Sequence, residues 1–225
     1  MLEGLIAKCP EMKDALGEAR IVLLTEEVYQ TSDFLVVSML QQYLTEGKAT
    51  TFVAWRENYA HYLSLSKKLS KSIEPFLKSG TLQYIECFQH SYCSELPLTE
   101  QHPSTYTPLP PKIRQLSVDA LIEEEGIVKE GGVLVMDAVE FVERIDVIFH
   151  LIEQALLRYC KVVIGGCSRN TPLYGILSNE SQFTMGVNSD VSGYGRVYLS
   201  ANNSEGQVLW RSVNSRMEFS QHVAL

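Results

Sequence analysis

The stretch Gly132-Val-Leu-Val-Met-Asp137 constrains the fold of this chain more than any other. A short apolar run that ends in one carboxylate is typical of a strand buried on both faces of a parallel sheet. The carboxyl end of such a strand opens onto the ligand crevice of the sheet. We therefore expect Asp137 at that edge, where nucleotide-hydrolysing proteins place an acid that holds magnesium or its water.

The composition, net charge and cysteine count favour a single soluble intracellular domain that spans residues 1–225. Hydrophobic residues make up 45% and charged residues 20%, as in globular chains. No apolar run reaches the ~18 residues of a membrane helix, and residues 1–18 mix charged with apolar side chains, unlike a secretory signal. The net charge of −8 argues against a general nucleic-acid coat, and five scattered cysteines fit reduced thiols. We expect a cytoplasmic location, with the nucleus also open.

Short apolar runs alternate with helical patterns along the chain. Predicted strands are 20–24, 50–55, 81–88, 132–137, 161–165, 183–187, 196–200 and 207–211. Predicted helices are a lead-in over 1–18, one after Ser32 that ends at Gly47, one that ends near 73–75, one over 117–125 and one over 142–159. This order predicts an α/β fold: a RecA-like, mostly parallel sheet flanked by helices, with antiparallel C-terminal strands. Other doubly wound folds begin the same way.

Residues 94–112 are predicted to be a surface loop. They hold Pro97, Pro103, Pro108, Pro110 and Pro111, five of the eight prolines of the chain. A loop this long is either functional, as an arm to a partner, or simply variable.

The turn between the first predicted strand and helix lacks a phosphate loop. A working loop reads G-x-x-x-x-G-K-[ST], where glycine amides and a lysine hold the phosphates and the hydroxyl holds magnesium. The degenerate position comprises Thr25, Glu26, Glu27, Gln30, Thr31 and Ser32, with Ser32 for the hydroxyl and Thr31 for the lysine. Glu26 and Glu27 then stand where phosphates belong, and each would repel a nucleotide by on the order of 1 kcal/mol or more. We expect no cofactor, no catalytic residue and a structural role for the strand-end acid Asp137.

Two further groups of residues give only weak signals, one for a zinc site and one for a catalytic cysteine. Cys87, His90, Cys93 and His102 have zinc-like spacings, but C-x-x-H-x-x-C is not a standard finger, and we expect no metal site. Cys167 could act as a nucleophile with His61 or His150, but a buried unreactive thiol is favoured.

Five basic residues are candidate RNA contacts. Lys67, Lys68, Lys71 and Lys78 form the basic cluster near the end of the second long helix. Arg169 lies in the segment after the strand 161–165, where RecA-like rings carry loops that face the central channel. The alternatives are a solvated face for the lysines and an ordinary Asn-Thr-Pro turn for Arg169.

Several short motifs, in order, resemble the sixth subunit of the Elongator complex. They are Phe34-Leu-Val, Phe52-Val-Ala54, Tyr59-Ala-His-Tyr62, the strand that ends at Asp137, and Val208-Leu-Trp-Arg211, and they run from about residue 18 to about 212. The resemblance implies a RecA-like subunit without a phosphate loop. It also implies a six-membered ring with the fourth and fifth Elongator subunits, which binds transfer RNA and supports wobble-uridine modification. The chain is short after residue 212, so the family contacts that a longer C-terminal strand would make are not carried over to it.

Two hypotheses of different classes therefore remain open. The first is the non-catalytic ring subunit. The second is a small-molecule enzyme on a doubly wound sheet that uses the crevice near Asp137, although the first loop lacks the glycines that such an enzyme needs. A third, weaker one is an ATPase that receives its missing lysine from a neighbouring subunit.

Overall fold

The computed structural model describes residues 2–27, 31–69, 71–87, 112–124, 126–189, 194–201, 204–213 and 216–224. Within these residues, ten strands form one sheet in the order β10-β9-β8-β7-β1-β6-β5-β2-β3-β4. The strands are β1 (Ile21–Glu26), β2 (Thr50–Ala54), β3 (Leu82–Glu86), β4 (Ile113–Gln115), β5 (Val133–Met136), β6 (Lys161–Ser168), β7 (Phe183–Ser189), β8 (Tyr194–Ala201), β9 (Ser204–Val213) and β10 (Arg216–Ala224).

The strands from β7 to β4 in this order pair in parallel with their neighbours. The other three strands continue the sheet with antiparallel pairs: β7 with β8, β8 with β9, and β9 with β10. The predicted class, a mostly parallel sheet finished by antiparallel strands, is confirmed. The central strands β1, β2 and β5 are buried along their whole length, as expected where helices cover both faces.

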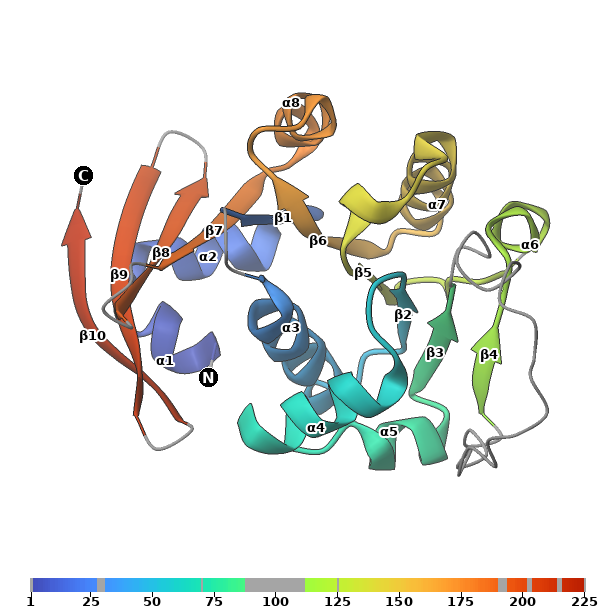
Figure 1. The fold of residues 1–225 in the computed structure, drawn as a ribbon, viewed down its shortest axis with the longest axis horizontal. Coiled ribbons are helices and arrows are strands. Elements are labelled where there is room, and N and C mark those ends of the chain that lie inside the picture. The colour runs from blue at the N-terminus through green and yellow to red at the C-terminus, as the bar shows by residue number, and fades with distance from the viewer. Residues whose placement is uncertain are drawn as a thin grey trace, which may run out of the picture.

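The helices form a layer on each face of the sheet (Figure 1). One layer contains α1 (Leu2–Ile6), α2 (Glu11–Glu18), α3 (Asp33–Thr45), α4 (Tyr59–Leu69) and α5 (Glu74–Ser79). The other contains α6 (Val118–Glu123), the 3-10 turn η2 (Val139–Phe141), α7 (Ile145–Leu157) and α8 (Pro172–Glu180). None of the helices in the described part of the chain is long and apolar enough to span a membrane.

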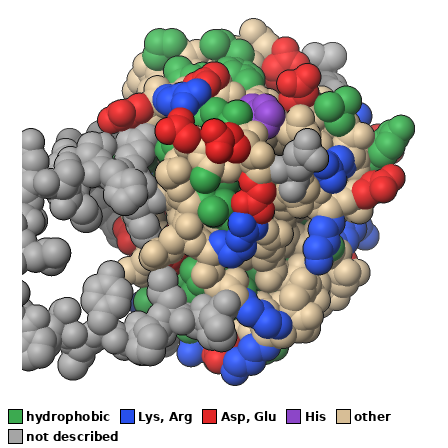
Figure 2. Space-filling model, turned by 90° about the vertical axis from the view of Figure 1, so that its right-hand side faces the viewer, with side chains coloured by type: hydrophobic (Ala, Val, Ile, Leu, Met, Phe, Trp, Pro, Cys, Tyr) green, Lys and Arg blue, Asp and Glu red, His purple; other side chains and the backbone are tan. Residues whose placement is uncertain are grey.

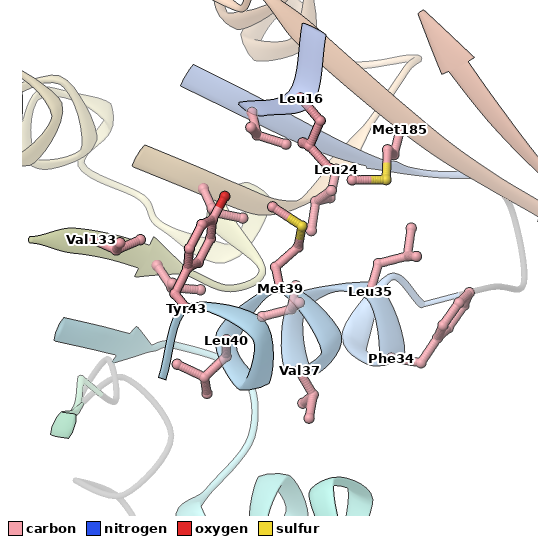
Figure 3. Close-up of a cluster of buried hydrophobic side chains, with 14 of the residues drawn as sticks. Leu16, Leu24, Phe34, Leu35, Val37, Met39, Leu40, Tyr43, Val133 and Met185 are labelled. Carbon is pink, nitrogen blue, oxygen red and sulfur yellow. The ribbon is translucent and has the colours of Figure 1, made fainter. Parts of the chain in front are cut away.

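Helix α3 lies at the centre of the first layer and is buried on almost every side. Its Met39 points toward Leu24 of β1 and Leu16 of α2, while Leu40 and Val37 face away from the sheet (Figure 3). A helix that is apolar all round belongs in the interior of a domain. The packing therefore fixes the N-terminal end of α3 firmly against the carboxyl ends of β1 and β6.

Two glycines let three backbone segments meet at that end. A Cβ at Gly166 would collide with the backbone of Ala138, and Gly166 has φ +67°, a conformation that suits glycine. A Cβ at Gly165 would lie 2.5 Å from Val36 Cγ2. The Gly165–Gly166 pair thus brings β6, the residues after β5 and α3 into contact around one small volume.

Helices α5 and α8 differ from the sequence prediction, which treats proline as the end of a helix. Pro75 lies in the first turn of α5, and Pro172 lies in the first turn of α8, positions that need no N–H donor. The predicted channel loop after β6 is therefore only a short turn followed by a helix. The proline-rich segment itself falls mostly outside the described residues.

Two strands, β4 and β10, are absent from the sequence prediction, and five extend beyond their predicted bounds: β1, β6, β7, β8 and β9. The three-residue strand β4 extends the sheet beyond β3. The last strand, β10, pairs antiparallel with β9 and was not among the predicted strands. Strand β1 continues through Thr25 and Glu26, so Glu26 of the degenerate phosphate-loop position is the last residue of the strand.

Helix α7 packs with a different face from the one that its apolar spacing predicts, which comprises Val142, Ile145, Phe149, Ile152, Leu156 and Tyr159. The buried residues are Val147, Ile148, Leu151, Ile152 and Ala155. Ile145 is 43% exposed and Tyr159 is 79% exposed, although both belong to the predicted face. The helix has apolar residues on two neighbouring faces, and β6 covers only one of them.

Replacing Thr171 by alanine is expected to lower the free energy of unfolding by about 1 kcal/mol. The Thr171 hydroxyl accepts the N–H of Tyr174 at 3.4 Å and donates to the Ser168 carbonyl at 2.8 Å, so it caps α8 and closes the turn before it. Urea unfolding would measure the loss. Thr171→Ser retains the hydroxyl and should recover most of it; an equal loss for serine would refute the capping role.

Candidate functional site

The carboxylate of Glu26 occupies the N-terminal end of α3. Glu26 is the last residue of β1 and is 6% exposed. Its Oε1 accepts the backbone N–H of Ser32 at 2.6 Å and the Ser32 hydroxyl at 2.8 Å. The start of the helix that follows the first strand is where phosphate-binding proteins hold an anion with backbone amides. In this chain the anion at the start of α3 is the Glu26 carboxylate of the protein itself.

Arg56, which follows β2, neutralises the carboxylates at this end of the sheet. Its Nη1 lies 3.2 Å from Glu26 Oε2, its Nη2 lies 3.3 Å from Glu26 Oε1, and Nη2 also donates to Asp33 Oδ1. His61 Nε2 adds a contact of 3.4 Å to Asp33 Oδ2. The Arg56 side chain is only 15% exposed, so the pair is largely removed from solvent.

The Ser32 hydroxyl is committed to the protein itself. It donates to Glu26 and accepts the backbone N–H of Gly166 at 3.1 Å. In a phosphate loop this hydroxyl would be a magnesium ligand. Thr31, at the position of the lysine, is exposed, and Gln30 lies outside the described residues.

Asp137 is fully buried and held by two donors. Its Oδ1 accepts the backbone N–H of Trp55 at 2.6 Å, and its Oδ2 accepts the Tyr62 hydroxyl. Burial raises the pKa of Asp137 to about 7, while the Tyr62 and Trp55 hydrogen bonds act in the opposite direction. Burial, with the neighbouring Asp137 carboxylate, also raises the pKa of Tyr62, which therefore remains a donor. The strand-end acid is therefore buried and hydrogen-bonded within the protein.

Arg169 lies along the end of the sheet. Its Nε contacts Thr25 Oγ1 at 3.4 Å, its Nη1 lies 3.8 Å from Glu27 Oε1, and its guanidinium carbon lies 5.6 Å from the centre of the Tyr198 ring. A Cβ at Gly186 would meet Arg169 Nη2 at 2.6 Å, so the glycine provides the room. Glu27 therefore pairs with Arg169 and does not join Glu26 at the helix start.

The lysines predicted to contact RNA belong to other elements than Arg169 does. Lys67 and Lys68 are exposed in the last turn of α4, and Lys71 is exposed just after it. Lys78 pairs with Glu74 at 2.7 Å. Figure 2 shows Lys and Arg side chains mostly over the lower half of one face and Asp and Glu side chains mostly over the upper half. No contact recorded for the described residues joins Arg169 to these lysines.

The cysteines offer no reactive or metal-binding group among the described residues. Burial raises the pKa of Cys87 and of Cys167 to about 11, which keeps both as thiols. No group of three or more potential ligands that could hold a metal ion occurs in the part of the chain that the structure describes. His90, Cys93 and His102 of the zinc hypothesis lie outside it.

The residues that complete this site were not predicted from the sequence. Arg56 comes two residues after the end of the buried strand β2, so the rule that singled out Asp137 could also have found it. Asp33 begins the helix after the degenerate loop. Tyr62 lies within the motif Tyr59-Ala-His-Tyr62, but its hydrogen bond to Asp137 joins residues from different elements.

Neither a protein-family model nor a curated protein matches this chain. Among solved structures, the flagellar accessory protein FlaH from Methanocaldococcus jannaschii is similar, with a TM-score of 0.56 over 89% of each chain and 11% sequence identity. The likeness shows the fold alone: the chain has a RecA-like fold.

Proposed function

We propose that this chain is a non-catalytic RecA-like subunit of a hetero-hexameric Elongator accessory ring, which binds transfer RNA and supports wobble-uridine modification. The observation that carries the proposal is the Glu26 carboxylate, which accepts the Ser32 amide where a nucleotide phosphate would lie. A subunit that needs no nucleotide can lose the phosphate loop and retain the fold for assembly. The motif resemblance from Phe34 to Arg211 supplies the identity of the ring.

The same geometry disfavours the alternatives. A small-molecule enzyme would need Asp137 to face its substrate, but this carboxylate is fully buried against Tyr62 and Trp55. An ATPase that borrows a lysine from a neighbour would still have Glu26 at the phosphate position, and a second carboxylate, Asp33, beside it. The chain is therefore proposed to use no cofactor of its own.

The experiment that tests the proposal is native mass spectrometry of the complex that purifies with the tagged chain from its own cells. The expected species has six subunits, and besides this chain it contains the fourth and fifth Elongator subunits. A monomer or a homodimer with no RecA-like companion would refute the ring.

Replacing Lys67, Lys68 and Lys71 together by glutamate is expected to weaken transfer RNA binding by the purified ring. Each lost phosphate contact should reduce the slope of log affinity against log salt by about 1. Filter binding at several salt concentrations would measure both quantities. Lys129→Glu, which changes an exposed lysine before β5, is the matched control. Unchanged affinity in the triple variant would mean that RNA contacts other surfaces.

A further inference from the structure

A surface groove of about 490 Å³ lies between α7 and α8, on the face of the sheet opposite α3 and α4. Both helices pack against β6. The floor consists of Ile21 of β1 and Ile164 of β6, and the walls are Phe149, Ile152, Leu156, Ile176 and Leu177. The lining is therefore almost entirely apolar.

Large apolar side chains remain exposed at this groove and beside it. Leu157 is 67% exposed and Ile176 is 50% exposed, and both line the groove. Tyr159, two residues beyond Leu157, is 79% exposed and has φ +57°, an unusual conformation for a bulky residue. Clusters of exposed apolar residues are typical of interaction sites.

The two charged residues that line the groove are both acidic, and Arg20 lies beside it, where its Nη2 donates to the Leu156 carbonyl at 2.8 Å. Glu153 of α7 and Glu180 of α8 are exposed at its rim, and no ion pair of either is recorded among the described residues. An acidic rim around an apolar floor repels nucleic acid and anionic lipid, and it attracts a basic partner.

We propose that this groove binds an amphipathic helix of another protein, with Lys or Arg residues flanking its apolar face. A trough between two helices on a sheet accepts a third helix, whose apolar residues at i, i+3, i+4 and i+7 reach the floor. The basic flanks would then meet Glu153 and Glu180. The inference goes beyond the proposed function, since it involves neither Glu26 nor the lysines of α4.

Other occupants fit the groove less well. A small apolar ligand on the floor would leave Leu157 and Ile176 exposed. The other exposed large hydrophobic residues in the described part of the chain are Phe141, Ile145 and Tyr159, and acidic residues neighbour the first two. A second copy of this chain therefore offers no described helix with an apolar face and basic flanks.

Fluorescence anisotropy with the full chain tests the proposal. The probe is a labelled helical peptide of about four turns, with leucines at i, i+3, i+4 and i+7 and flanking lysines. Ile176→Glu is expected to weaken binding by about tenfold or more, because it places a charge in the apolar wall. Glu153→Lys with Glu180→Lys should also weaken it, and should create binding to a second peptide with glutamate flanks.

Ile145→Glu is the matched control, since it changes an exposed isoleucine of α7 that does not line the groove. Binding that is unaffected by Ile176→Glu, or equally weakened by Ile145→Glu, overturns the proposal. A chain that binds a small apolar dye but not the peptide overturns it in favour of a ligand pocket. Self-association that Ile176→Glu abolishes, seen by light scattering, overturns it in favour of a second copy.

Discussion

Replacing Arg56 by methionine is expected to lower the free energy of unfolding by about 3 to 5 kcal/mol. The side chain is 15% exposed and pairs with Glu26 and Asp33, each 6% exposed as a residue. Methionine replaces the aliphatic part of the arginine side chain but has no guanidinium, so both carboxylates would remain buried without their main partner. Urea unfolding at neutral pH would measure the loss, with the midpoint and slope compared between variants.

The control for this substitution is Arg114→Met. Arg114 pairs with Glu124 at 2.5 Å, but the two side chains are 39% and 30% exposed, so its loss should cost less than about 1 kcal/mol. Adding Glu26→Gln and Asp33→Asn to Arg56→Met should restore most of the stability, because no buried charge would then lack a partner. A loss at Arg56 no larger than the loss at Arg114 would contradict the electrostatic account of this site.

Replacing Asp137 by asparagine is expected to change how stability depends on pH. The folded chain holds the pKa of Asp137 at about 7, against 3.8 for the free side chain, so folding favours the protonated form. This contribution is fully present below about pH 4 and is lost as the pH rises through 7. The stability of Asp137→Asn relative to the native chain should therefore rise by roughly 4 kcal/mol between about pH 4 and about pH 8.

Chemical unfolding of both chains at several pH values would show this change as a difference curve. Asp14→Asn, which removes an exposed carboxylate on α2, should give a flat difference over the same range. A flat curve for Asp137→Asn as well would mean that the buried carboxylate does not favour its protonated form.

The fold class followed from the sequence because local signals set it. Runs such as the four apolar residues of β5 have no polar face, so only a strand covered on both sides suits them. The cap of α8 was also present in the sequence as Thr171-Pro172, yet proline was read there as the end of structure. That error omits the nine-residue helix α8 but does not affect the strands of the sheet.

The site was only partly predictable, because its contacts join residues far apart in the chain. Glu26 and Ser32 are close in sequence, and the excess of carboxylates in that turn was visible. Arg56 reaches them only because β2 ends at the same edge of the sheet. The hydroxyl of Tyr62 meets Asp137 across α4 and β5, a pairing that no local pattern indicates.

We propose that Glu26 holds the place of a phosphate and that this chain therefore binds no nucleotide. Isothermal titration of the purified chain with magnesium-ATP tests it most directly. We predict no saturable heat at nucleotide concentrations up to about 1 mM, because the Ser32 amide and hydroxyl and the Arg56 guanidinium are already paired. Saturable binding in the micromolar range, abolished by a substitution at Ser32, would contradict the account.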